Sequence, residues 1–288
     1  MRSGKVRAGT LLLAVFTLLA LIGPWLAEPL IGAGPRTIDY DALGVAPGAT
    51  GHPLGTTTSG EDVLAQLLVG ARGSVLVGLV TGVVATGLAI LVGLVSGFAG
   101  GRTDKILTLF TNVMLTLPGL PLILIIAGYL QEPGPLTIGL LLGLLGWSAS
   151  ARYLRAQTMS LRGRDFVAAM RMVGESRTRL VFAEILPHLT GLISALFLSG
   201  VIGGVLGEAA LAFLGIVTPD TVSWGTMISE AQDQSALMRG MWWWFGPPGL
   251  CIALLGSAIA LLNFGIDEIG NPRLRVRTTT RRRRVHTA

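Results

Sequence analysis

Six long apolar runs without Asp, Glu, Lys or Arg constrain what this chain can fold into. Each approaches or exceeds the roughly 20 helical residues that cross about 30 Å of hydrocarbon. Inside a membrane every backbone polar group needs a partner, and a helix supplies these partners within its own segment. We therefore expect an all-α integral membrane protein with six transmembrane helices, at residues 10–27, 73–101, 106–131, 133–151, 188–207 and 240–266.

The composition supports the same class. Of the 288 residues 51% are hydrophobic and 13% are charged, whereas about a quarter are charged in ordinary soluble domains. The first run follows Arg2, Lys5 and Arg7, as a signal peptide would, but it is longer than a usual signal core and no A-x-A cleavage site follows it. We expect it to be an uncleaved first helix. The single cysteine, Cys251, lies in the last run and can form no internal disulfide.

The distribution of charge predicts the orientation. With the N-terminus inside, the segments 1–9, 102–105, 152–187 and 267–288 are cytoplasmic and hold 19 of the 22 Lys and Arg residues. The opposite side keeps Arg36, Arg72 and Arg239 beside nine acidic residues. This is the bias of the positive-inside rule. We expect a multi-pass protein of a prokaryotic cytoplasmic membrane with both termini cytoplasmic, and the high pI then needs no nucleic-acid partner.

The chain is expected to divide into three parts. Residues 1–9 form a cytoplasmic N-terminus and residues 10–272 the six-helix transmembrane domain. Residues 273–288 form a basic tail that concentrates like charge without apolar periodicity, so we expect it to be disordered. Contact of this tail with anionic membrane lipid is the alternative.

Features within the spans predict how the helices meet. Glycines recur at four-residue spacing, which lets helix backbones approach closely; the pairs are 78/82, 93/97, 139/143, 200/204 and 203/207. Pro118 and Pro121, in "LTLPGLPL", should break or kink the third span. Such a kink suits a helix that lines a transport path and equally a helix that bends only to pack against its neighbours. Glu208 lies at the outer end of the fifth span, where a structural hydrogen bond is favoured over a functional role.

The chain shows no motif of catalysis, metal binding or phosphate binding. His52, His188 and His286 are far apart, and H-E-x-x-H, G-x-S-x-G and G-x-x-x-x-G-K-[ST] do not occur. We therefore expect no catalytic residue, cofactor or metal in this chain. The spans also carry no relay of acids and histidines with which a proton-driven carrier would work.

The cytoplasmic segment 152–187 is rich in arginine and predicts a short amphipathic hairpin. Phe166, Ala169, Met170 and Val173 fall at i, i+3, i+4 and i+7 and make one apolar stripe. Gly174 should end this helix, and a second short helix should end at Pro187. Periodicity leaves two interpretations open: a helix lying on the lipid surface, or a docking surface for a cytoplasmic partner.

The residues of this hairpin resemble a known family. "F-V-x-A-x-R-x-x-G-x-S" at 166–176, followed by "ILP" at 185–187, is similar to the cytoplasmic coupling loop of C-type permease subunits of ABC importers for dipeptides, oligopeptides and nickel. The match continues in "HPLGT" at 52–56, "GFAGG" at 97–101, "SLR" at 160–162, "EAALAFLG" at 208–215 and "SWG" at 223–225, and it spans roughly residues 8 to 272. The usual acid of the loop's E-A-A is replaced by Ala168.

The resemblance implies the function and the partners. The chain would pair with a homologous B-type permease, two cytoplasmic ATPase subunits that bind ATP and Mg²⁺, and an extracytoplasmic substrate-binding protein. Peptides are the first expected substrate, nickel or a nickel chelate the second, and an autonomous carrier is the alternative from another class. The residues that the resemblance assigns to ATPase coupling are Phe166, Ala168, Ala169, Met170, Val173, Gly174, Ile185, Leu186 and Pro187.

Overall fold

The computed structural model describes residues 4–32, 34–49, 51–130, 133–218 and 220–270. Within these ranges the chain is helical and contains no β-strand, which confirms the expected all-α class. The helices are α1 (Gly4–Ile31), α2 (Val63–Ala99), α3 (Gly101–Thr116), α4 (Gly119–Tyr129), α5 (Pro135–Arg162), α6 (Asp165–Met172), α7 (Arg177–Arg179), the π-helix η1 (Leu180–Ile185), α8 (Leu186–His188), α9 (Thr190–Phe213), α10 (Trp224–Asp233) and α11 (Trp242–Gly270).

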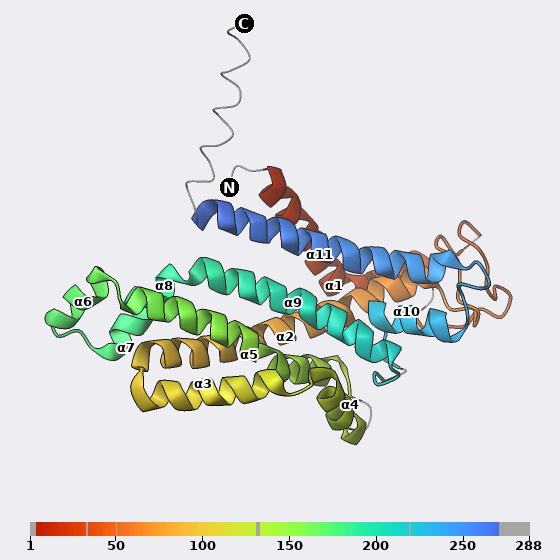
Figure 1. The fold of residues 1–288 in the computed structure, drawn as a ribbon. Helices are drawn as coiled ribbons and strands as arrows, with labels where there is room; N and C mark the ends of the chain where they lie inside the picture. The colour runs from red at the N-terminus through yellow and green to blue at the C-terminus, as the bar shows by residue number, and fades with distance from the viewer. Residues whose placement is uncertain (1–3, 33, 50, 131–132, 219, 271–288) are drawn as a thin grey trace, which may run out of the picture.

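The long helices lie side by side, with α2 in contact with α1, α5 and α9 (Figure 1). The short helices α6, α7 and α8 lie at one end of this bundle, which we call the α6 end. The helix α10 and the loop before α2 lie at the other, which we call the α10 end. The helix α1 packs against α11 with its first turns, since Val6 contacts Gly265.

Four helices are long and apolar enough to cross a membrane. They cover the first, second, fifth and sixth apolar runs, at Val6–Ala27, Val63–Ala99, Thr190–Phe213 and Trp242–Gly265. The helices α3 and α4 pass the same test together, but they are bent by 82°. The helix α5, on the fourth run, carries three arginines in its second half and is not among these candidates. Within its described part the chain is thus a multi-pass membrane protein with four or five candidate spans.

The predicted break in the third run is confirmed. The helix α3 ends at Thr116, and Leu117 is extended with φ −68° and ψ 131°. A residue before proline is disfavoured in the helical conformation, so Pro118 sets this extended geometry. Pro118 is the N-cap of α4 and Pro121 lies in its first turn, where a missing N–H breaks no helical hydrogen bond.

The second span begins earlier than residue 73, where the sequence places its start. The carboxylate of Asp62 accepts a hydrogen bond from the backbone N–H of Ala65, at 2.8 Å, and caps α2 from Val63 onward. A side-chain acceptor at this position satisfies one of the free N–H groups of a helix start. The helix therefore includes Gln66 and Arg72, which precede the apolar run. This first part of α2 lies at the α10 end of the bundle.

The second helix of the hairpin does not end at Pro187, contrary to the sequence prediction. The segments α7, η1 and α8 follow one another and lead directly into α9 at Thr190. In the π-helix the N–H of Leu186 donates to the carbonyl of Val181, five residues back. Pro187 is the second residue of α8, where the wider turn before it accommodates the missing N–H and the ring.

Glycines form the contacts between the long helices, as their spacing predicts. A Cβ on Gly78 would lie 2.8 Å from the carbonyl oxygen of Val201 in α9, and one on Gly204 would lie 2.7 Å from the side chain of Thr81 in α2. Gly93 and Gly97 meet α5 in the same way. Such small residues allow close helix approach where lipid removes the hydrophobic drive between helices. Among the predicted pairs Gly203 is the exception, with no atom within 4 Å of its virtual Cβ.

This packing predicts the effect of a single added methyl group. Gly78→Ala should destabilise the purified chain by about 1–3 kcal/mol, because the new methyl meets the α9 backbone, which cannot rotate away. Gly87→Ala, on the same helix, has no atom within 4 Å of the added Cβ and should leave stability unchanged. Unfolding of both variants in mild detergent is the measurement. Equal stability of the two variants would contradict the packing described here.

Candidate functional site

The helix α6 is terminated by Gly174, as the sequence predicts. Gly174 has φ +85°, and its N–H donates to the carbonyl of Arg171 at 3.1 Å while the N–H of Glu175 donates to Met170 at 3.2 Å. These two bonds form a Schellman motif, in which the left-handed residue is most often glycine. The chain thereby reverses and enters α7, whose first turn is capped by the Ser176 hydroxyl.

The predicted apolar stripe of α6 is divided between two faces. Phe166 and Met170 pack, with the fully buried Val167, against a core cluster formed by α2, α5 and η1. Ala169 and Val173 are exposed instead. The stripe is divided because Val167, outside the predicted set, points to the centre of the inward face. The outward face consists of Ala168, Ala169, Met172 and Val173.

Sequence reasoning missed Met172, whose exposed fraction is 83%. Its position two residues after Met170 places it on the opposite face of the helix. Two of the remaining predicted coupling residues hold the segment in place, since Ile185 is buried and Leu186 packs against the same cluster. Pro187 is exposed. The ring of Phe166 stacks on His188 with centroids 5.2 Å apart, which joins α6 to α8.

A cavity of about 360 Å³ lies among α2, α4, α5 and α9. The break predicted from the prolines contributes to it, since Gly119 and Leu120, between Pro118 and Pro121, are part of its wall. Most of the lining is apolar, and Thr81, Ser150 and Ser199 add hydroxyl groups. The structure thus brings the broken third run and the fifth run to one cavity.

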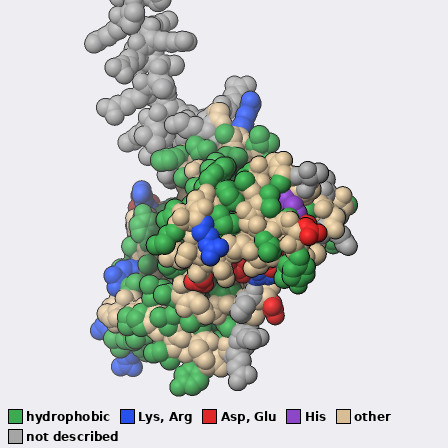
Figure 2. Space-filling model, turned by 90° about the vertical axis from the view of Figure 1, so that its right-hand side faces the viewer, with side chains coloured by type: hydrophobic (Ala, Val, Ile, Leu, Met, Phe, Trp, Pro, Cys, Tyr) green, Lys and Arg blue, Asp and Glu red, His purple; other side chains and the backbone are tan. Residues whose placement is uncertain are grey.

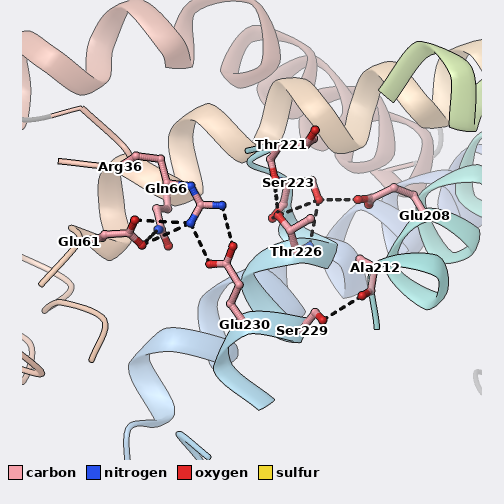
Figure 3. A network of polar contacts seen from close by, with 10 residues as sticks. All are labelled: Arg36, Glu61, Gln66, Glu208, Ala212, Thr221, Ser223, Thr226, Ser229 and Glu230. Atoms are coloured by element: carbon pink, nitrogen blue, oxygen red, sulfur yellow. Dashed lines mark hydrogen bonds and ion pairs between the residues drawn. The ribbon is translucent and has the colours of Figure 1, made fainter. Parts of the chain in front are cut away.

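Glu208 is fully buried at the α10 end of α9, away from this cavity (Figure 3). Its Oε1 accepts a short hydrogen bond from the hydroxyl of Ser223, the N-cap of α10. Ser223 and Thr226 bond each other reciprocally as a capping box. A Cβ on Gly225 would lie 2.8 Å from Glu208 Oε2, so only glycine fits there. The "EAALAFLG" and "SWG" motifs thus meet through Glu208.

A second polar cluster joins the loop before α2 to α10. Arg36 Nη2 lies 2.6 Å from Glu230 Oε1, and Arg36 Nη1 lies 3.4 Å from Glu61 Oε2. Gln66 donates to the same Glu61 oxygen at 2.7 Å. Figure 3 shows the guanidinium between the two carboxylates. In the sequence, Arg36, Glu61 and Glu230 enter only the count of charges on the non-cytoplasmic side, because Arg36 and Glu230 are 194 positions apart.

His52 connects two parts of the loop before α2, Asp39 and the helix cap Asp62. Its Nδ1 lies 2.8 Å from Asp62 Oδ2 and its Nε2 lies 3.3 Å from Asp39 Oδ2. The hydrogen bond with Asp62 raises the pKa of the imidazole above its ordinary value, against partial burial, which lowers it.

Figure 2 shows the α10 end, where apolar side chains cover much of the surface and the charged ones lie in small groups.

Comparison with known proteins agrees with this arrangement. Residues 89–276 match the family described as "Binding-protein-dependent transport system inner membrane component". This range contains the hairpin, Glu208 and the cavity walls that α4, α5 and α9 contribute. The chain belongs to this family. The match confirms the resemblance that the hairpin and its companion motifs indicate in the sequence.

Three relatives show how far the similarity extends. The chain is 33% identical to an oligopeptide transport system permease protein OppC of Mycobacterium tuberculosis, over 88% of this chain and 87% of the relative. It is 33% identical to the di/tripeptide transport system permease protein DppC of Pseudomonas aeruginosa, over 93% and 88%. For OppC of Bacillus subtilis the identity is 29%, over 95% and 88%. Each of these matches covers most of this chain and most of the relative.

The raised pKa of His52 predicts a pH-dependent stability. Its contribution is fully present below the unfolded pKa of about 6.5 and is lost as the pH rises through the higher folded pKa. The melting temperature of the purified protein should therefore fall more between about pH 6 and about pH 9 than that of His52→Gln, which cannot titrate. Thermal unfolding in detergent at both pH values checks this. The same pH dependence in both proteins would show that the His52–Asp62 pair contributes nothing.

Proposed function

We propose that the chain is the permease subunit of an ATP-driven ABC importer of peptides and forms half of the translocation path. The family match over residues 89–276 is the observation that carries this proposal. The peptide substrate is supported by the relatives, which are oligopeptide and di/tripeptide permeases. ATP and Mg²⁺ are bound by two partner ATPase subunits, and a homologous B-type permease completes the path. An extracytoplasmic binding protein delivers the peptide.

The subunit lies in the cytoplasmic membrane with the α6 end inside. Seven arginines of the segment 152–187 lie at or lead into this end, whereas the α10 end carries Glu61, Glu230 and Asp39. This is the charge bias of the positive-inside rule. In this orientation α5 and the bent pair α3–α4 cross the membrane beside the four long candidates, which makes six spans with both termini cytoplasmic.

The cavity beside the broken span is the part of the path that this subunit contributes. Broken helices in a membrane are tolerated where the freed backbone lines a cavity or is buried in protein. The turn at Gly119 does line the cavity, and Ser150 and Ser199 offer hydroxyl groups to a peptide backbone. The companion permease would close the open side of this cavity.

The outward face of α6 docks on the ATPase. Ala168, Ala169, Met172 and Val173 leave this face apolar and unpaired within the described part of the chain. An exposed apolar face on a short helix, backed by a buried inward face, is the form of a helix that fills a groove on a partner. The Schellman turn at Gly174 and the stack of Phe166 on His188 hold it rigidly against the bundle.

Transport by the assembled and the lone chain tests the function. Co-purified with its companion permease, ATPases and binding protein, the chain should support ATP-dependent uptake of di- or oligopeptides into liposomes. Alone it should move no substrate under a proton or sodium gradient, since its spans carry no charge relay. Gradient-driven uptake by the lone chain would instead support a carrier, and uptake of nickel without peptide would replace the proposed substrate.

Two methionine substitutions, one at each end of the helix bundle, test whether the outward face of α6 docks on the ATPase. Met172→Asp places an unpaired carboxylate in the proposed groove, so ATPase retention should fall at least about tenfold. Met238→Asp, at the α10 end, makes the same change at a residue with an exposed fraction of 93% and should leave retention unchanged. Co-purification of the ATPase with each variant is the measurement. If Met172→Asp retains as much ATPase as the parent chain, the outward face of α6 is not the docking surface.

A further inference from the structure

Two neighbouring cavities lie at the α6 end, outside the proposed path and the docking face. The first is an apolar groove of about 260 Å³ between the last turns of α2 and the start of η1. Its walls include Leu91, Val95 and Phe182, whose exposed fractions are 63%, 41% and 58%. These side chains lie on the exposed surface of α2, a candidate membrane span, and of the hairpin, so the groove opens to the outside of the bundle.

The second cavity, of about 250 Å³, is polar and adjoins the first. Three arginines from three elements line it: Arg162 at the end of α5, Arg171 in α6 and Arg177 at the start of α7. Phe98, Ala99 and Arg177 line both cavities, so the groove and the arginine pocket adjoin along a shared wall. The guanidinium of Arg171 lies over the ring of Phe98, 5.2 Å from its centroid, at this junction.

The arginine pocket has an excess of positive charge. Glu175 is its one acidic lining residue, and it is paired with Arg179 at 3.1 Å. Within the described part of the chain, Arg162, Arg171 and Arg177 form no ion pair with a carboxylate. Three guanidiniums around one small cavity repel one another, and a bound anion would offset this repulsion. Guanidinium forks match the oxygens of a phosphate particularly well.

We propose that the two cavities together bind one anionic glycerophospholipid of the cytoplasmic leaflet. The phosphate lies among Arg162, Arg171 and Arg177, and an acyl chain lies in the groove along Leu91 and Val95. A basic pocket that adjoins an apolar groove favours a lipid over a free phosphate, which would use the pocket alone. This assignment rests on the proposed orientation, which places the α6 end at the cytoplasmic leaflet.

Such a lipid would touch α2, α5 and the hairpin at once. Arg171 belongs to the helix whose outward face is proposed to dock on the ATPase, and Arg162 ends the helix that packs along α2. The headgroup would therefore hold the hairpin against the bundle, and the lipid composition of the membrane would influence coupling. The pocket arginines, which are not part of the proposed docking face, would thus have a binding role.

Retained lipid, identified by native mass spectrometry of the complete transporter, tests the proposal. After exchange into detergent with phosphatidylglycerol, the parent should retain one such lipid, and with phosphatidylcholine none. Arg162→Gln combined with Arg177→Gln should lower retention at least about tenfold. Arg102→Gln combined with Arg164→Gln removes the same charge from two arginines that do not line the pocket, so this variant should retain the lipid. Equal retention in the two double variants, or of phosphatidylcholine in the parent, overturns the proposal.

A change in the groove separates the lipid from other occupants. Val95→Trp fills the groove and leaves the arginines intact, so it should also lower lipid retention. Binding unaffected by Val95→Trp, or displaced by inorganic phosphate, would mean a free anion and overturn the proposal. A photo-reactive residue at Phe182 should capture lipid, and capture of a companion subunit would overturn it equally. Because the readout is bound mass, this result is independent of whether the complex imports peptides.

Discussion

The close approach of α2 to α5 and α9 is the constraint on which the rest of the structure depends. Apolar side chains gain little by leaving lipid for a neighbouring helix, so helices in a membrane associate through tight packing. Glycines provide this packing on both contacts of α2: Gly78 and Gly82 face α9, and Gly93 and Gly97 face α5. The helix α10 contacts α2 directly, the cavity has α2 in its wall, and the hairpin contacts α5, which packs along α2.

The two ends of α2 are fixed by different chemistry. At the α10 end its first turn is capped by Asp62, which also bonds His52, and Ser74 accepts a hydrogen bond from the backbone N–H of Trp224. At the α6 end its last turns meet α5 and the hairpin through glycine contacts and the ring of Phe98. One rigid helix thus connects the face proposed to receive substrate with the face proposed to receive the ATPase.

The candidate site was predictable where a local signal exists. The turn at Gly174 and the break at Pro118 follow from backbone geometry that only glycine and proline favour. The inward and outward faces of α6 do not follow, because the neighbour that buries Val167 comes from other parts of the chain. Family motifs indicated which segment matters and left open which of its side chains are exposed.

The helical class, the apolar runs and the four-residue spacing of the glycines can be read from the sequence alone, because each follows from residues close together in the chain. The charge bias needs only a count of residues along the chain. The tertiary structure decided that α7, η1 and α8 run through Pro187 into α9, and that α2 starts at Val63. It also decided that Arg36 joins Glu61 to Glu230 and that Arg162, Arg171 and Arg177 surround one pocket. The Arg36 cluster depends on helix packing over 194 positions of sequence, for which a single sequence holds no local signal. The three arginines are close in sequence, but the turns between α5, α6 and α7 decide that they surround one pocket.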